Sequence, residues 1–318
     1  MSKIKNVPVC IIVPLYNKEA SINDCIQSVL QQDYRDFSLI IVNDGSTDNS
    51  LARAKLIEDP RITILNQDNK GVSSARNNGI MAAITNGATH LFLLDADDIW
   101  FPNHINTHIK LKNRFPRATV FGSNYVIRKN EKTRTARFSN LKDDMDQYLD
   151  RFFEKNFLDP VLHCSSTSFS DTIVNTVGVF DENITHGEDT DFFIKVGISL
   201  NIAFSLKVTN IFDQDSENRS DIVKLNKRNL IDLDIYEEKI YKFPGLKKYL
   251  DLNRFSLALQ FRTHNDIKNA KAYEAKINAE NLNLKQRQLL KLKGKQLRSL
   301  KKIQEFLGNK GLRLKTGN

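Results

Sequence analysis

Short apolar runs alternate with amphipathic stretches through roughly the first hundred residues of the chain. The runs are rich in Val, Ile, Leu and Phe, which is typical of strands buried on both faces of a parallel sheet. The stretches between them carry apolar residues three or four positions apart, as a helix packed on a sheet requires. We therefore predict strands over residues 9–13, 37–42, 61–65 and 90–94, and helices over residues 21–30, 51–58 and 72–84.

Repeated strand–helix units predict an α/β fold with a mostly parallel sheet and helices on both of its faces. The pattern continues less regularly to about residue 220, with a polar, basic stretch over 128–137 that predicts an exposed loop or hairpin. Beyond that point it is helical. We predict a domain over residues 1–220 and a smaller, all-helical region over residues 221–318. The further elements predicted are strands at 119–122 and 202–206, an extended segment at 165–170, and helices at 147–157 and 188–200.

The composition is that of a globular protein, with 40% hydrophobic and 27% charged residues among 318. No apolar run reaches the eighteen or so residues of a membrane span. The chain leads from Met1 directly into its first strand, without the core of a signal peptide. Three widely spaced cysteines (Cys10, Cys25 and Cys164) match neither a disulfide framework nor a zinc site. These features predict a cytoplasmic location.

The basic character of the chain is confined to its end. The net charge is +9, yet residues 285–318 carry +10 and the remainder −1. Five apolar residues of this segment fall on one helical face opposite the basic ones, which predicts a helix at an anionic membrane surface. A helix packed on the body, or on a partner, is the alternative. Nucleic-acid binding is disfavoured because Phe306 is the only aromatic residue there. The apolar residues are Leu290, Leu297, Leu300, Ile303 and Leu307.

Polar residues gather where three of the predicted strands end. These segments are 14–19, 43–46 and 95–98, and in parallel sheets ligands bind at that edge. Asp95 and Asp97 together can bind a hard divalent cation, Mn²⁺ or Mg²⁺, that bridges a diphosphate. The alternative is a solvated acidic turn.

Three other residues near this edge have both a functional and a structural interpretation. Asp44 can accept hydrogen bonds from a base or ribose, or can serve only the Asp-Gly turn. Tyr16 can stack on a nucleobase, or pack as a half-buried aromatic residue. Arg76 can face a phosphate or base, or lie on the surface.

Four motifs occur in order along the first hundred residues or so. Together they resemble the inverting glycosyltransferase family 2, whose catalytic domain has the Rossmann-like GT-A fold. The resemblance spans about residues 7–220, with later matches at 178–182 and 187–191, and is not specific for a sugar. The motifs are Val-Pro-x-Tyr-Asn at 13–17, Val-Asn-Asp-Gly-Ser-Thr-Asp at 42–48, Gly-Val-Ser-x-Ala-Arg-Asn at 71–77 and Leu-Asp-Ala-Asp-Asp at 94–98.

The resemblance implies a role for individual residues. Asp189 would be the general base that takes the proton from the acceptor hydroxyl, with Glu188 tuning it; the alternative for Asp189 is a helix N-cap. Asp97, with Asp95, would bind the metal. The residues expected to bind the nucleotide-sugar donor are Pro14, Tyr16, Asn17, Glu19, Asp44, Arg76, Asp95 and Ala96.

One position departs from the family pattern. Many members carry a His after the strand that follows the Glu-Asp helix, and this His can touch the diphosphate or metal. Here Asp215 stands at that position, and Arg219 is a candidate phosphate contact. The six His residues show no zinc-ligand spacing.

The leading hypothesis is an inverting transfer from a nucleoside-diphosphate sugar, most often a UDP-sugar. The acceptor would be a glycan or a lipid-linked glycan of surface polysaccharide assembly, at the inner face of the cytoplasmic membrane. A nucleotidyltransferase would need a Gly-rich signature, and residues 14–19 contain no glycine. A non-catalytic binding protein using its basic tail is the second hypothesis, against which the intact Asp95, Asp97 and Asp189 argue. The motifs leave the oligomeric state open.

Overall fold

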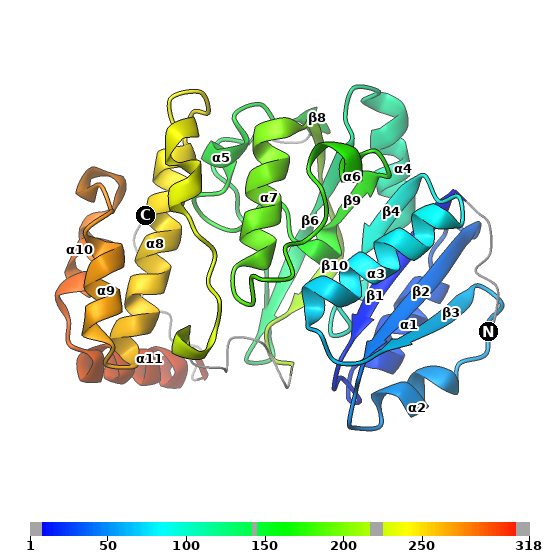
Figure 1. Cartoon of the computed structure of the whole chain (residues 1–318), viewed down its shortest axis with the longest axis horizontal. Coiled ribbons are helices and arrows are strands. Elements are labelled where there is room, and N and C mark those ends of the chain that lie inside the picture. Colours follow the sequence, from blue (N-terminus) through cyan, green and yellow to red (C-terminus); the bar gives the residue numbers. More distant parts are fainter. Residues whose placement is uncertain (1–7, 142–144, 217–224, 310–318) are drawn as a thin grey trace. The chain divides into compact units, whose positions relative to one another are not determined.

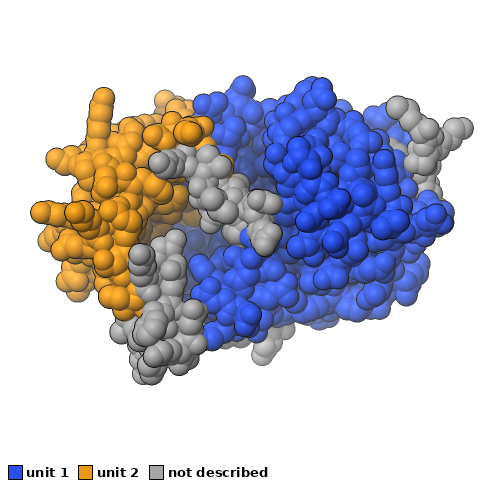
Figure 2. All heavy atoms as spheres, turned by 90° about the horizontal axis from the view of Figure 1, so that it is seen from below, with its two compact units in different colours: residues 1–222, 229–231 blue, residues 223–228, 232–318 orange. Residues whose placement is uncertain are grey.

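The computed structural model describes residues 8–141, 145–216 and 225–309. The chain divides into two compact units, which are coloured separately in Figure 2. The first contains residues 1–222 and 229–231, and the second contains residues 223–228 and 232–318.

The first unit is built on one ten-stranded sheet, whose main path runs β3-β2-β1-β4-β9-β6-β10-β5 (Figure 1). Neighbours among β3, β2, β1 and β4 are parallel, as are β6 and β10. The short β9 lies antiparallel between β4 and β6, so the sheet is mixed. The strands are β1 (Val9–Leu15), β2 (Phe37–Asp44), β3 (Ile62–Gln67), β4 (His90–Leu93), β5 (Ile99–Trp100), β6 (Val120–Lys129), β7 (Lys132–Thr135), β8 (Gln147–Tyr148), β9 (Thr167–Ser170) and β10 (Ile202–Asp213).

Helices cover both faces of this sheet, as the strand–helix alternation predicts. On one face, Ile11 of β1 and its neighbours pack against the apolar sides of α1, α2 and α4. On the other face lie α3 and α7 (Figure 1). A Cβ on Gly79 of α3 would lie 2.3 Å from Ile12, so only glycine lets this helix approach β1 so closely. The helices of this unit are α1 (Ile22–Leu30), α2 (Ser50–Lys55), α3 (Val72–Thr85), α4 (His104–Arg114), α5 (Phe152–Lys155), α6 (Ile173–Thr176) and α7 (Glu188–Ser199), with a 3₁₀ turn at Cys164–Ser166.

The prediction of a helix over residues 147–157 is wrong at its start. Gln147 and Tyr148 form β8, which pairs antiparallel with Phe204 and Ala203 of β10. Arg151 then has φ 57°, a left-handed conformation that interrupts any helix, and α5 covers only Phe152–Lys155. The pairing partner lies more than fifty residues away in sequence. Local periodicity therefore could not reveal this strand.

The second unit is helical, and its apolar core contains a buried, ion-paired arginine. Its longest helix, α8, buries Leu250, Leu257 and Phe261 together with Arg254. The Arg254 guanidinium is 1% exposed and pairs with Asp234 at 2.9 Å and with Glu237 at 2.5 Å. Its helices are α8 (Leu246–Thr263), α9 (Ile267–Glu274), α10 (Leu284–Lys291) and α11 (Gly294–Asn309), with 3₁₀ turns at Leu225–Lys227, Asp234–Lys239 and Ala279–Asn281.

Gly294 separates the last two helices of this unit. It begins α11, after a break that follows α10. A Cβ at this position would lie 2.2 Å from the carbonyl oxygen of Arg262, so close approach of two backbones requires glycine. Leu297 of α11 is 7% exposed, whereas Leu300 and Ile303 are 38% and 49% exposed. The apolar face of the basic segment is thus only partly covered.

No helix in the described part of the chain is long and apolar enough to span a membrane.

Candidate functional site

Arg76 joins two other predicted site residues, Asp189 and Asp95. Its Nη1 donates to Oδ1 of Asp189 at 2.6 Å, and its Nη2 donates to Oδ1 of Asp95 at 2.7 Å. Its guanidinium is 3% exposed and lies over the ring of Phe180, 5.1 Å from the centroid. Burial lowers the pKa of Arg76, but the carboxylates of Asp189 and Asp95 outweigh this effect and raise it well above its usual value. Arg76 is therefore a fixed cation between α3, α7 and the end of β4.

Asp189 and Glu188 lie in the first turn of α7, directly after Gly187. Gly187 has φ 87°, and a Cβ there would lie 2.6 Å from Ile231, so the entry to this helix requires glycine. Burial raises the pKa of Asp189 to about 6, with Arg76 opposing the shift and Glu188 and Asp95 adding to it. The Asp189 side chain is still 40% exposed, so a bound molecule can reach it. A carboxylate with such a pKa is suited to accept a proton near neutral pH.

Asp97 faces a different cation. Its Oδ2 lies 2.7 Å from the Lys18 ammonium nitrogen and accepts a hydrogen bond from the Ser216 hydroxyl at 2.5 Å. Lys18 and Asp97 are each 14% exposed. Each acid of the pair Asp95 and Asp97 is therefore matched by one basic side chain of the same chain.

Asp44 is 2% exposed and is hydrogen-bonded to the segment before α3. One carboxylate oxygen accepts from the Gln67 side chain and the Lys70 backbone, both at 2.8 Å, and the other accepts from the Gly71 backbone at 2.9 Å. A carboxylate offers about four acceptor positions, so one remains for a ligand. The geometry gives Asp44 a role in shaping this loop.

The residues after β1 differ in what they offer. Tyr16 is 44% exposed, and its ring can take a stacked ligand. The side chains of Asn17 and Glu19 instead accept from the backbone of Thr47 at 2.8 Å and of Asn49 at 2.9 Å, and so fix the loop that follows β2. Pro14 and Ala96 are buried.

The structure shows which groups Asp215 binds, at the position where many family members carry a His. Its carboxylate accepts from the backbone of Asn130 at 2.6 Å and of Glu131 at 3.0 Å, at the tip of the β6–β7 hairpin. Both hairpin residues have positive φ, which a carboxylate cap of this kind stabilises. Ser216, the next residue, is the one that reaches Asp97. Arg219 lies outside the described residues.

Sequence reasoning missed several residues that shape the site. Asn77 holds Phe180 through two hydrogen bonds to its backbone, at 2.9 and 3.0 Å, and so ties α3 to the segment before α7. Cys164 donates to Asp189 at 3.5 Å, and Ser165 accepts from the backbone of Asp95 at 3.1 Å. Asn77 is the last residue of the motif at 71–77 and Lys18 lies in the polar segment 14–19, whereas Cys164 and Ser165 carried no local signal.

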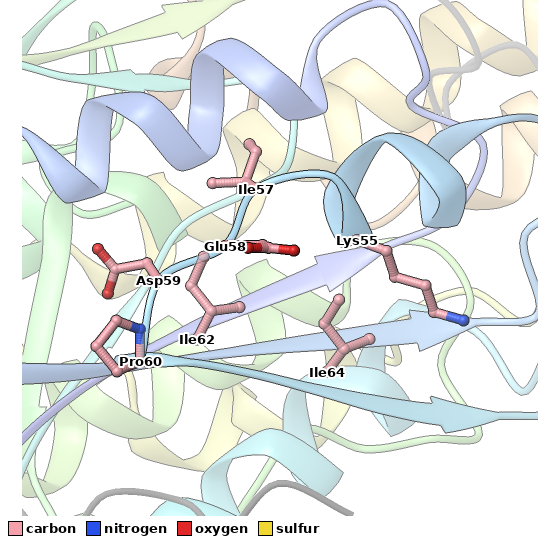
Figure 3. Close-up of a pocket in the computed structure, with 7 residues that line it drawn as sticks. All are labelled: Lys55, Ile57, Glu58, Asp59, Pro60, Ile62 and Ile64. Atoms are coloured by element: carbon pink, nitrogen blue, oxygen red, sulfur yellow. The ribbon is translucent and has the colours of Figure 1, made fainter.

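A hollow lies elsewhere, beside the edge strand β3 (Figure 3). It has a volume of about 550 Å³ and contains none of the predicted site residues. Its lining comes from α2, from β3 and from the turn between them, namely Lys55, Ile57, Glu58, Asp59, Pro60, Ile62 and Ile64. Within the parts of the chain that the structure describes, no three His, Cys, Asp or Glu side chains are arranged to bind a metal ion.

Solved structures share this architecture. The chain aligns with S. aureus TarS 1–349 in complex with UDP-GlcNAc over 89% of this chain and 78% of the other, with a TM-score of 0.58 and 13% identity. It aligns with the mannosyltransferase PcManGT from Pyrobaculum calidifontis, in complex with GDP-Man and Mn²⁺, over 96% of this chain and 86% of the other, with a TM-score of 0.56 and 16% identity. At these identities the likeness concerns the fold.

Sequence relatives identify the family. Glycosyltransferase GlyG of Streptococcus pneumoniae is 33% identical over 37% of this chain, and the glucosyltransferase WfgD of Escherichia coli is 33% identical over 38%. WfgD is a UDP-Glc:α-D-GlcNAc-diphosphoundecaprenol β-1,3-glucosyltransferase. The chain spans 39% of GlyG and 47% of WfgD, less than half of either. The profile of glycosyl transferase family 2 matches residues 10–178, more than half of the chain. The chain therefore belongs to glycosyl transferase family 2.

Proposed function

We propose that this protein transfers a hexosyl or N-acetylhexosaminyl group from a UDP-sugar to a hydroxyl of a glycan or lipid-linked acceptor, with inversion at the anomeric carbon. The observation that carries the proposal is the double ion pair of Arg76. It holds Asp189, the candidate base, and Asp95, a candidate donor-site acid, on the two nitrogens of one guanidinium. A base and a donor site must lie this close for an acceptor oxygen to contact both.

In this mechanism Asp189 accepts the proton of the acceptor hydroxyl as its oxygen attacks the anomeric carbon. The attack comes from the face opposite the leaving diphosphate, which inverts that carbon. Arg76 holds the ionised form of Asp189 and so opposes the effect of burial on its pKa. Glu188 acts through its charge, which favours the protonated form of Asp189. Tyr16 stacks on the base of the donor.

Asp95 and Asp97 fit a divalent cation. Carboxylate oxygens are the ligands that Mn²⁺ and Mg²⁺ prefer. Asp97 already pairs with one cation, the Lys18 ammonium group at 2.7 Å. Nucleotide enzymes commonly bind such a metal through one or two carboxylates, with the phosphates supplying further oxygens. When bound, the cation would neutralise negative charge on the diphosphate leaving group.

The UDP-sugar donor is favoured by analogy. TarS was solved with UDP-GlcNAc, WfgD uses UDP-Glc, and PcManGT was solved with GDP-Man, so the nucleotide is the first property to test. The acceptor of WfgD is lipid-linked. We propose a similar acceptor here, met at the cytoplasmic face of the membrane. In this proposal residues 1–220 form the catalytic domain, and the basic segment 285–318 contacts anionic lipid through exposed residues such as Leu300 and Ile303.

The test is thermal stability with UDP, GDP or TDP, each with Mn²⁺ or with EDTA. A ligand that binds only the folded protein raises the melting temperature. We expect a metal-dependent rise for UDP that is lost in Asp97→Ala and kept in Glu58→Ala, whose exposed side chain lines the hollow beside β3. No rise with any nucleotide would refute the donor site and favour the binding-protein hypothesis. A metal-dependent rise for GDP alone would indicate a GDP-sugar donor in place of the UDP-sugar.

A further inference from the structure

Both acids of the Asp95–Asp97 pair form ion pairs with basic side chains of the chain itself. Arg76 holds Asp95 at 2.7 Å, and Lys18 holds Asp97 at 2.7 Å. The two cations differ in how firmly they are held. The Arg76 guanidinium is 3% exposed and also binds Asp189, whereas the Lys18 side chain is 14% exposed and lies at the edge of the site.

Lys18 is anchored through its backbone, and its ammonium group lies 2.7 Å from Oδ2 of Asp97 and 3.5 Å from the Ser216 hydroxyl. Its N–H donates to the Ser50 hydroxyl at 2.6 Å, and its carbonyl oxygen accepts from the backbone of Ser21 at 3.1 Å and of Ile22 at 3.0 Å. The base of the side chain is therefore fixed at the start of α1. The four-carbon stem beyond it ends in a compact ammonium group that can exchange one oxygen partner for another.

We propose that Lys18 competes with the divalent cation for Asp97. Its ammonium group holds Asp97 until the donor diphosphate arrives, and then moves to the phosphate. This rests on the proposed function, because it assumes a diphosphate donor at the site. It makes metal and nucleotide binding depend on each other, so that Asp97 binds metal weakly in the nucleotide-free protein.

Electrostatics gives this coupling its direction. A divalent cation approaching Asp97 alone must displace an ammonium group at 2.7 Å and leave it beside the positive charge of the metal. A diphosphate removes both penalties, since its oxygens bind the metal and offer the displaced ammonium a new anionic partner. The Ser216 hydroxyl donates to the same oxygen of Asp97 at 2.5 Å, and it can keep this hydrogen bond whether Asp97 pairs with Lys18 or with the metal.

The test measures Mn²⁺ binding directly, by the electron paramagnetic resonance signal of the free ion, with and without UDP. Lys18→Gln removes the competing charge, Lys18→Arg keeps it, and Lys55→Gln is the matched control at an exposed lysine outside the site. Without nucleotide, we expect Lys18→Gln to bind Mn²⁺ about five- to tenfold more tightly than the wild type, the range of one partly exposed ion pair. Lys18→Arg and Lys55→Gln should bind like the wild type.

The gain in Mn²⁺ affinity of Lys18→Gln should also depend on Asp97. We expect it to disappear in the double variant Lys18→Gln/Asp97→Asn, and we expect UDP to increase Mn²⁺ affinity less in Lys18→Gln than in the wild type. Unchanged Mn²⁺ binding by Lys18→Gln, or a gain that persists without Asp97, overturns the inference. If wild-type protein binds UDP with Mn²⁺ in the melting assay, such a result refutes only the role of Lys18. Absence of UDP binding by the wild type refutes the donor site itself.

Discussion

Acid pH should destabilise the first unit through a buried chain of histidines and hydroxyl groups. Successive members are joined by hydrogen bonds of 2.6–3.0 Å. Burial lowers the pKa of all three imidazoles, and that of His108 falls from 6.5 to about 3. The chain runs His90, Ser168, His108, Ser123, Thr209, His104.

The sign and size of the effect follow from the pKa of His108. Folding lowers the pKa of His108 from 6.5 to about 3. The stability that depends on the neutral imidazole is therefore fully present above pH 6.5 and is lost steadily as the pH falls toward 3. At pH 5 the unfolded imidazole has taken up a proton and the folded one has not. The difference of about 1.5 pH units from 6.5, at about 1.4 kcal/mol each, gives a loss of about 2 kcal/mol. Typical total stabilities are only about 5–15 kcal/mol.

The assay uses a natural probe. Trp100 is the only tryptophan of the chain and stacks on His104, with 4.0 Å between ring centroids. Its fluorescence in urea titrations between about pH 8 and pH 5 therefore reports the unfolding of this unit. Burial also raises the pKa of Asp98 and Asp189, which acts in the opposite direction. The wild type is for that reason compared with a variant at each pH.

The variant is His108→Gln, which can still donate to one hydroxyl and accept from the other but does not titrate. Between pH 8 and pH 5, we expect the free energy of unfolding of the wild type to fall by about 2 kcal/mol more than that of the variant. His264→Gln, at an exposed histidine, should run parallel to the wild type. If His108→Gln also runs parallel to the wild type, His108 is not held neutral by burial and the reasoning is refuted.

Three further predictions concern the base and the second unit. Asp189→Asn should lower the transfer rate by about 10²–10⁴-fold while UDP still raises the melting temperature, and a native rate would exclude Asp189 as the base. Because the pKa of Asp189 is raised to about 6, wild-type turnover should be level above pH 6 and fall below it; a level profile down to about pH 4.5 would contradict this. Gly294→Ala should destabilise the second unit by about 1–3 kcal/mol in circular dichroism melts, since its Cβ would lie 2.2 Å from a backbone oxygen of Arg262. The exposed Ser299→Ala in the same helix should change stability by less than about 0.5 kcal/mol, and equal effects of the two substitutions would rule out the steric explanation.

The sequence by itself determined the elements of the first half of the sheet and the edge at which the site lies. Apolar runs marked β1 to β4, because strands buried on both faces must be apolar throughout. Since the carboxyl ends of parallel strands share one edge, the same runs placed segments 14–19, 43–46 and 95–98 together. The functional roles of their residues stay predictions. Both inferences needed only local pattern and one rule of topology.

Only the tertiary structure decided which side chains meet. The pairs Lys18–Asp97, Arg76–Asp189 and Asp97–Ser216 are separated by 79, 113 and 119 residues. Nothing in the local sequence around any member of a pair encodes its partner, because the contact depends on how α3 and α7 pack against the sheet and on where β10 lies within it. The same holds for the position of β9: the sequence predicts an extended segment at 165–170, but only the fold places Thr167–Ser170 between β4 and β6. Periodicity and turn chemistry are local and can be read along the chain, whereas ion pairs and strand insertion depend on contacts between distant segments.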